Sequence, residues 1–267
     1  MADVGPGGPT LGGSASFAAL AAARLGLRAA VVTCAAEGFP PDGALAGVGL
    51  HVRETPATTS FENRYDADGR RVQRLLALAP DLAAADVPPA WRRVGVLHLA
   101  PVCREVGPEV ARAVRADLVG LTPQGWLRRL EVGAAVRQSP WEAPEGLLEA
   151  ADVVVLSRED LGGEPRGAAW LAAQVDLLVV TDGPRGATAF TIGRTLAQPA
   201  FSARALDPTG AGDVFAAMLF VRLWERGELG DALRFAAAAA ALAVEAPAAE
   251  GVPTRAAVEA RLAGGSE

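Results

Sequence analysis

Seven residues in the C-terminal half of the chain combine small side chains with carboxylates just before an apolar, helical stretch. They run Asp207-Pro208-Thr209-Gly210-Ala211-Gly212-Asp213. Consecutive small residues let backbone N–H groups approach an anion closely, and a helix that begins here adds the positive end of its dipole. Asp213 stands where a carboxylate can take the proton from a substrate hydroxyl. The alternative is an ordinary turn in which Asp207 or Asp213 only caps the helix.

The elements that must position these residues follow from the periodicity of the chain. Short apolar runs bounded by turn residues predict strands of a mostly parallel sheet covered on both faces. They lie at residues 29–33, 94–99, 118–121, 153–156 and 177–181. Residues 14–25 have the composition of a helix, and the chain after Asp213 is almost purely helical. Alternation of polar and apolar residues from 58 to 76 predicts a hairpin with one wet face.

Composition agrees with one large α/β domain. The 267 residues carry a net charge of −6 with no block of basic residues, which argues against nucleic acid or an anionic membrane as the main partner. All 25 basic residues are arginines, so no lysine can serve a Walker loop or a Schiff base. Cys34 and Cys103 read as reduced, buried thiols, and His51 and His98 have no metal-ligand spacing. With no long apolar stretch or signal peptide, the cytoplasm is the expected location.

The run from 207 to 213 resembles the second signature of the ribokinase family, the PfkB carbohydrate kinases, which reads Asp-Thr-x-Gly-Ala-Gly-Asp. Four other segments resemble family features in family order: a Gly-Gly motif and its helix, the turn of a β lid, a strand followed by an Asn-x-x-Glu motif, and a strand with a glycine loop on the nucleotide side. They begin at Gly12, Asp68, Ala151 and Val179. The resemblance implies one ribokinase-like domain over residues 1–267, a three-layer α/β/α fold with a mostly parallel central sheet and a β lid inserted at about residues 53–76.

The same resemblance implies an ATP-dependent kinase that transfers the γ-phosphate to a hydroxyl of a sugar, cyclic polyol or nucleoside-like small molecule. Asp213 is then the base, while the N–H groups around Gly210, Ala211 and Gly212 hold the γ-phosphate. The residues implied in nucleotide binding are Thr181, Gly183, Gly186, Thr209 and Asp207. Asp207, Thr209 and carbonyls near Gly251 are also implied in holding a monovalent cation such as K⁺. The glycine loop reads equally as a plain turn, so a purely structural interpretation of it stays open.

Two motifs depart from the family pattern. In place of Asn-x-x-Glu, which organises Mg²⁺ and its waters, the chain has Ser157 and Asp160, which would hold the metal indirectly through water or only cap a helix. The residues implied in substrate binding are Asp3, Gly12, Gly13 and Phe17. Phe17 stands where sugar kinases such as ribokinase carry an asparagine. The motifs are most similar to the branch that includes plant myo-inositol kinase, so a cyclic polyol is the sharper expectation.

Family members open with a buried strand that ends in a substrate-binding aspartate, whereas only Met1-Ala2-Asp3-Val4 precede a segment rich in Gly and Pro here. We therefore expect the first family strand to be missing and the true start to lie upstream. The resemblance further implies a homodimer formed through the lid. The alternative function is a catalytically impaired relative that binds a small molecule or a nucleotide. An unrelated dinucleotide-binding enzyme is disfavoured, because no Gly-x-Gly-x-x-Gly loop follows a first strand.

Overall fold

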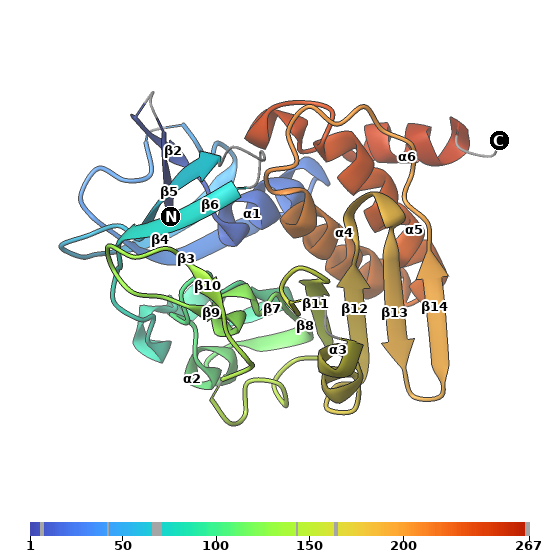
Figure 1. Ribbon diagram of the computed structural model, residues 1–267, viewed down its shortest axis with the longest axis horizontal. Coiled ribbons are helices and arrows are strands. Elements are labelled where there is room, and N and C mark those ends of the chain that lie inside the picture. The colour runs from blue at the N-terminus through green and yellow to red at the C-terminus, as the bar shows by residue number, and fades with distance from the viewer. Residues whose placement is uncertain (6–7, 42, 66–70, 143, 163–164, 265–267) are drawn as a thin grey trace.

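A six-stranded sheet forms the centre of the molecule (Figure 1). The structure is a computed structural model that describes residues 1–5, 8–41, 43–65, 71–142, 144–162 and 165–264. The strand order is β14-β13-β12-β11-β8-β7, and the four strands from β12 to β7 are parallel. Their bounds are β7 Arg93–Leu99, β8 Arg115–Leu121, β11 Val153–Ser157, β12 Leu177–Thr181, β13 Ala187–Thr191 and β14 Arg194–Gln198. The predicted, mostly parallel sheet is confirmed for the strands at 94–99, 118–121, 153–156 and 177–181, and β13 and β14 add an antiparallel hairpin at one edge that the periodicity did not predict. The strand predicted at 29–33 is not part of this sheet, because it pairs with another strand in a separate sheet.

Alternate residues of the inner strands face two different helical layers, which explains why these strands read as continuous apolar runs. Val155 and Val179 pack in the same cluster as three helices, α1 (Ser14–Arg24), α4 (Ala211–Arg226) and α5 (Leu229–Ala243). Val154 and Leu178 face the opposite side, toward α2 (Pro108–Arg112) and α3 (Pro165–Ala172). The fold therefore has the three layers that the sequence predicts.

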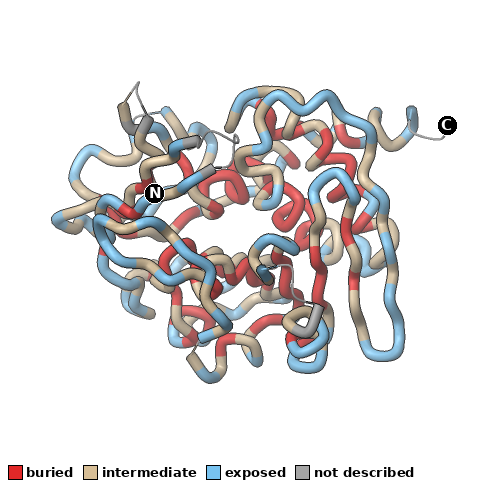
Figure 2. The backbone as a smooth tube through the Cα atoms, viewed as in Figure 1, coloured by how far each residue is buried: buried red, intermediate tan, exposed pale blue. Residues whose placement is uncertain are grey.

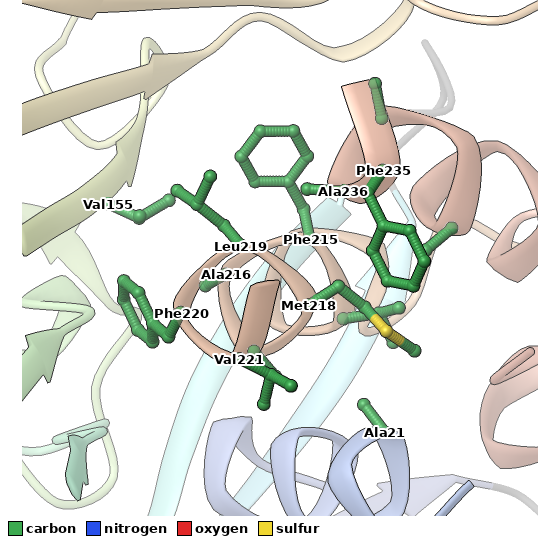
Figure 3. Packing of buried hydrophobic residues seen from close by; sticks show 14 of the residues in the cluster. Ala21, Val155, Phe215, Ala216, Met218, Leu219, Phe220, Val221, Phe235 and Ala236 are labelled. Carbon is green, nitrogen blue, oxygen red and sulfur yellow. The ribbon is translucent and has the colours of Figure 1, made fainter. Parts of the chain in front are cut away.

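Helix α4 is deeply buried in its first half, where eight consecutive residues from Val214 to Val221 are buried. Figure 3 shows its side chains reaching Val155 of the sheet, Ala21 of α1 and Phe235 of α5. The alanines of α5 let the two helices approach closely, and a Cβ at Gly120 of β8 would collide with the ring of Phe220. Small residues thus set how deeply α4 sits on the sheet, and this fixes the start of α4 relative to the strand ends. The short helix α6 (Arg255–Gly264) follows α5.

Two smaller sheets lie beside this body. One pairs β3 (Ala29–Ala35) with β4 (Val48–Glu54) in parallel. The other, which we call the lid, has the order β2-β1-β5-β6. Its strands are β1 Ala2–Gly5, β2 Gly8–Leu11, β5 Ser60–Tyr65 and β6 Arg71–Ala77. The short strands β9 (Arg128–Arg129) and β10 (Arg137–Gln138) lie next to it, because the backbone of residues 134–136 pairs with β6.

The lid differs in extent from the predicted insertion at residues 53–76. Residues 53 and 54 belong to β4, and the N-terminal residues contribute two strands. The segment Asp68-Gly69-Arg70 lies outside the described residues. Figure 2 shows that buried residues concentrate in α1, α4, α5 and the inner strands, while β14 at the edge of the sheet has exposed and intermediate residues. In the described part of the chain no helix is long and apolar enough to cross a membrane.

Candidate active site

The run from 207 to 213 forms the turn that leads into α4. Gly210 is the residue before the helix and has a φ of 77°, a left-handed conformation that favours glycine. A Cβ there would also strike the ring of Phe17. Gly212 lies in the first turn, is exposed, and has no other part of the chain within 4 Å of where its Cβ would be. The first N–H groups of a helix have no partner within the helix, so this open turn is suited to bind an anion.

Phe17 supports this turn from below. Its side chain is only 4% exposed and belongs to the main core, and α1 begins three residues earlier, at Ser14. Phe17 was predicted to bind substrate. In the structure its ring is buried and packs against Gly210 instead. Because Gly210 has no Cβ, the ring of Phe17 can pack directly against its backbone, and an apolar ring suits this buried contact.

Asp213 lies in the first turn of α4 and is partly exposed. A carboxylate at this end of a helix is favoured by the helix dipole. It follows the open N–H groups around Gly212 by one residue, so an acceptor hydroxyl near Asp213 is also near the anion site. The structure thus brings Gly210, Ala211, Gly212 and Asp213 into a single turn.

Asp207 braces the turn against the segment that follows α5. Its Oδ1 accepts a hydrogen bond from the N–H of Thr209 at 2.9 Å, and its Oδ2 accepts one from the N–H of Ala248 at 2.9 Å. Partial burial raises the pKa of Asp207, but the hydrogen bonds from Thr209 and Ala248 outweigh this effect and hold the pKa below its usual value. Ala248 opens the 3₁₀ turn Ala248–Gly251, so the residues implied in cation binding do lie together. In this structure, however, both oxygens of Asp207 accept backbone hydrogen bonds.

The two motifs expected on the donor side meet at the carboxyl ends of neighbouring strands. Ser157 of β11 and Thr181 of β12 are directly paired. Asp160 folds back on Ser157, because its Oδ2 accepts hydrogen bonds from the N–H and the hydroxyl of Ser157 at 2.9 and 2.7 Å. These two residues close a turn, and residues 158–162 that follow Ser157 are also turn rather than helix.

An arginine pair flanks the glycine loop, and the sequence analysis did not identify it. Asp182 accepts hydrogen bonds from the Nε of Arg158 at 2.8 Å and from the Nε of Arg185 at 2.8 Å. The hydrogen bond from Arg185 is the main cause that lowers the pKa of Asp182, and Arg158 adds to it. Gly183 and Gly186 bound the turn that carries Arg185. Arg158, which follows β11, and Arg185 of the glycine loop thus bring two guanidinium groups together at Asp182, the residue after Thr181.

The residues expected on the substrate side lie where the lid meets α1. Asp3 is in β1, and its carboxylate lies so close to Gly12 that a Cβ at Gly12 would collide with it. Gly13 is the residue before α1. A cavity of ≈ 50 Å³ opens beside these glycines and is also lined by Met1, Thr33 and Glu105. Burial raises the pKa of Glu105, although the N–H groups of Val102 and Cys103 donate to its carboxylate and oppose this effect.

Polar residues on the lid are the second feature that the sequence analysis missed. Asn63 donates from Nδ2 to the Oδ1 of Asp3 at 3.0 Å, and Gln73 donates from Nε2 to the Oδ1 of Asn63 at 3.0 Å. The sequence contained a pattern that could have found them. Asn63 is two residues from the apolar Phe61 and Gln73 two residues from the apolar Leu75, so each polar residue shares a strand face with a buried one.

Comparison with known proteins agrees with the fold and the signature. Residues 140–255 match the family described as pfkB family carbohydrate kinase. Ribokinase of Arabidopsis thaliana, solved with ribose and ATP, has a TM-score of 0.73 at 22% identity, over 98% of this chain and 95% of that chain. A pyrophosphate-dependent kinase in the ribokinase family, solved with a pyrophosphate analogue and myo-inositol, has a TM-score of 0.78 at 22% identity, over 97% and 96%. A nucleoside kinase of Methanocaldococcus jannaschii has a TM-score of 0.74 at 21% identity, over 96% and 87%. Residues 140–255 thus match the pfkB family of carbohydrate kinases, and the chain as a whole shares the fold of the solved ribokinase-family structures.

Proposed function

We propose that this protein is an ATP-dependent kinase that phosphorylates a hydroxyl of a cyclic polyol or sugar. The observation that supports this most directly is the turn from Gly210 to Asp213, in which the exposed first turn of α4 at Gly212 lies next to a carboxylate. Phosphoryl transfer needs an aligned hydroxyl and stabilisation of charge on the transferred group, and this turn can supply both.

In the proposed reaction, Asp213 accepts the proton of the acceptor hydroxyl as its oxygen attacks the γ-phosphorus. The N–H groups around Gly210, Ala211 and Gly212 stabilise the negative charge on the transferred group. Thr181, Gly183 and Gly186 bind the nucleotide, and the neighbouring Arg158 and Arg185 add positive charge on the donor side. Asp207 and Thr209 keep the turn in place, and together with the 3₁₀ turn at Ala248–Gly251 they are the residues that would hold K⁺.

Mg²⁺ bound to the donor phosphates would neutralise charge during transfer. Asp160 commits Oδ2 to Ser157, which suits contact with metal-bound waters better than a cage of direct ligands. Among the described residues no group of three or more His, Cys, Asp or Glu side chains is arranged to hold a metal. The residues present therefore fit a metal that arrives with the nucleotide.

The alternative is a relative that binds small molecules or nucleotides without efficient chemistry. The burial of Phe17 and the closed turn of Ser157 and Asp160 are the observations that favour it. Intact Asp213 and the open N–H groups near Gly212 favour the kinase.

The test is turnover of a panel of polyols, sugars and nucleosides with ATP or pyrophosphate as donor, followed by mass detection of the product. We expect Asp213→Asn to lower kcat by ~100 to 10,000-fold while ATP binding is retained, because only proton transfer is removed. Asp231→Asn is the matched control, since Asp231 is also a first-turn aspartate, on α5. Absence of turnover for every acceptor with both donors, alongside tight ATP binding, would contradict the kinase and support the binding protein.

A further inference from the structure

Arg24 lies in the last turn of α1 and binds the backbone of a segment 226 to 228 residues further along the chain. One of its terminal nitrogens, Nη1, donates to the carbonyl oxygen of Glu250 at 3.2 Å and to that of Val252. These carbonyls lie on either side of Gly251, where the 3₁₀ turn Ala248–Gly251 ends. A single guanidinium group on α1 therefore holds the end of this turn.

The 3₁₀ turn has a backbone that needs support from outside it. Ala248 has a φ of 40°, which lies in the left-handed region that residues other than glycine rarely adopt. A Cβ at Gly251 would collide with the carbonyl oxygen of Ala243, so the turn also packs tightly against the end of α5. A residue such as Ala248 keeps a left-handed backbone only where the surrounding contacts hold it there. The bonds of the turn with Arg24 at one end and with Asp207 at the other are contacts of this kind.

Ala248 is also the residue through which the turn reaches the candidate active site. Its N–H donates to the Oδ2 of Asp207 at 2.9 Å, while the Oδ1 of the same carboxylate accepts the N–H of Thr209, the residue before Gly210. A change in the orientation of the Ala248 N–H would remove one of the two bonds that hold this carboxylate. The carbonyls bound by Arg24 and the anion site around Gly210 are thus joined by one short run of contacts.

Arg255, the first residue of α6, binds the same end of α1 without contacting the turn. Its Nε donates to the carbonyl oxygen of Leu25 at 3.2 Å, and its terminal nitrogens donate to the carboxylate of Glu225 at 2.5 and 3.1 Å. In the described part of the chain, none of its hydrogen bonds reaches residues 248–252. Both arginines fasten the end of α1 to the C-terminal part of the chain, and of the two it is Arg24 that holds the turn.

We propose, resting on the kinase function above, that Arg24 is a positioning residue for phosphoryl transfer. It holds the strained turn Ala248–Gly251, and through Ala248 and Asp207 it keeps the backbone around Gly210 in the position that stabilises the transferred phosphate. A displacement of about 1 Å in the catalytic geometry can cost about 100-fold in rate, so a distant support of this kind affects catalysis. The competing interpretation is that Arg24 only fastens α1 to the C-terminal part of the chain, where a basic residue also suits the end of the helix dipole.

The experiment compares Arg24→Met with the matched control Arg255→Met, using ATP and the acceptor of highest turnover in the panel above. Each change removes one guanidinium group from the same end of α1 and keeps an apolar side chain. We expect Arg24→Met to lower kcat ~10 to 100-fold with the acceptor KM within ~2-fold, because Arg24 lies at the opposite end of α1 from Gly12 and Gly13. Arg255→Met should lose thermal stability but keep kcat within ~2-fold of the wild type. Arg24→Lys should recover part of kcat, because an ammonium group can donate to the same carbonyls. Equal kcat in Arg24→Met and Arg255→Met would overturn the proposal.

A double-mutant cycle with Asp207→Ala tests the route of the effect. If Arg24 acts through Asp207, Arg24→Met should lower kcat by less than ~3-fold in the Asp207→Ala background, because the link is already broken there. Losses of kcat that multiply in the double variant would show that Arg24 acts by another route, and they would overturn the proposal.

Hydrogen exchange separates this inference from the kinase function, because it needs no turnover. The amides of residues 207–212 and 248–252 should exchange faster in Arg24→Met than in the wild type, and at the wild-type rate in Arg255→Met. If the wild type turns over no acceptor, the kinase function fails, while faster exchange of both segments in Arg24→Met alone still supports the role of Arg24 in holding the anion site. Unchanged exchange of residues 207–212 in Arg24→Met would overturn that role. Arg24→Gln replaces Arg24→Met if that variant fails to fold, because its amide can keep one hydrogen bond to the turn.

Discussion

At the residue scale, the glycines Gly210 and Gly212 belong to one motif but are required for different reasons. Gly210 needs glycine for its left-handed backbone and for the ring of Phe17 beside it. Gly212 is helical and open to solvent, so a methyl group meets nothing there except an incoming ligand. The motif thus combines one residue required by the fold with one required by the proposed chemistry.

We therefore expect Gly210→Ala to lower the free energy of unfolding by ~1 to 3 kcal/mol, from left-handed strain and the contact with Phe17. Gly212→Ala should leave stability unchanged or raise it by up to ~1 kcal/mol, yet lower kcat because the methyl group obstructs the anion site. Denaturant unfolding and steady-state kinetics check both variants. Equal stability of the two would contradict the assigned roles, and in a double-mutant cycle Gly210→Ala should cost less in the Phe17→Ala background than in the wild type.

At the element scale, the start of α4 is held by a contact between two loops. Asp207 joins the turn before α4 to the 3₁₀ turn after α5, and the N–H groups of Leu206 and Asp207 donate to the carbonyl of Val244 at 2.7 and 3.1 Å. Helix packing fixes α4 along its length, while these bonds, together with the ring of Phe17, fix the loop that presents Gly210. The position of the anion site is therefore a property of two segments about forty residues apart.

We expect Asp207→Ala to reduce the free energy of unfolding by about 1 to 2 kcal/mol, the loss of two hydrogen bonds to partly buried N–H groups. Hydrogen exchange should speed up at residues 207–209 and 244–251 together. Asp182→Asn is the control, because Asp182 also has a lowered pKa but sits in an exposed ion-pair network, where a smaller loss of stability is expected. Faster exchange at only one of the two segments would show that Asp207 does not couple them.

At the scale of the whole molecule, His98 connects the sheet to its helical layer. Its ring stacks edge-on against Phe220 of α4 with centroids 4.9 Å apart, and its Nε2 lies 3.0 Å from the hydroxyl of Thr122. Nδ1 is buried without a hydrogen-bond partner in the described part of the chain. Burial lowers the pKa of His98 to about 4, so the native protein holds this ring neutral.

Stability should therefore depend on pH through His98. Above pH ~6.5 neither the folded nor the unfolded chain protonates this ring and its contribution is complete. As the pH falls from ~6.5 toward ~4, the unfolded chain binds a proton that the native state excludes, and stability drops by up to ~1.4 kcal/mol per pH unit. Denaturant unfolding across this range should show a shallower slope in His98→Gln than in the wild type. His51→Gln, at an exposed position on β4, controls for the loss of an imidazole, and a wild-type slope in His98→Gln would contradict the prediction.

The sequence alone determined most of the parallel strands, the helices and the presence of a glycine-rich turn at the start of α4, because these depend on local periodicity and on residue types that few other structures need together. The chemistry assigned to that turn stays a prediction. Only the tertiary structure decided the rest. The alternation of polar and apolar residues on the lid was recognised from the sequence. Val72 was assigned to the apolar face, yet it is 43% exposed, whereas Asn63 and Gln73 lie on the inner face. Which face of a strand is inner depends on what packs against it, and no local pattern contains that information. In the same way, Phe17 became the support of Gly210 because two segments nearly two hundred residues apart meet in the core.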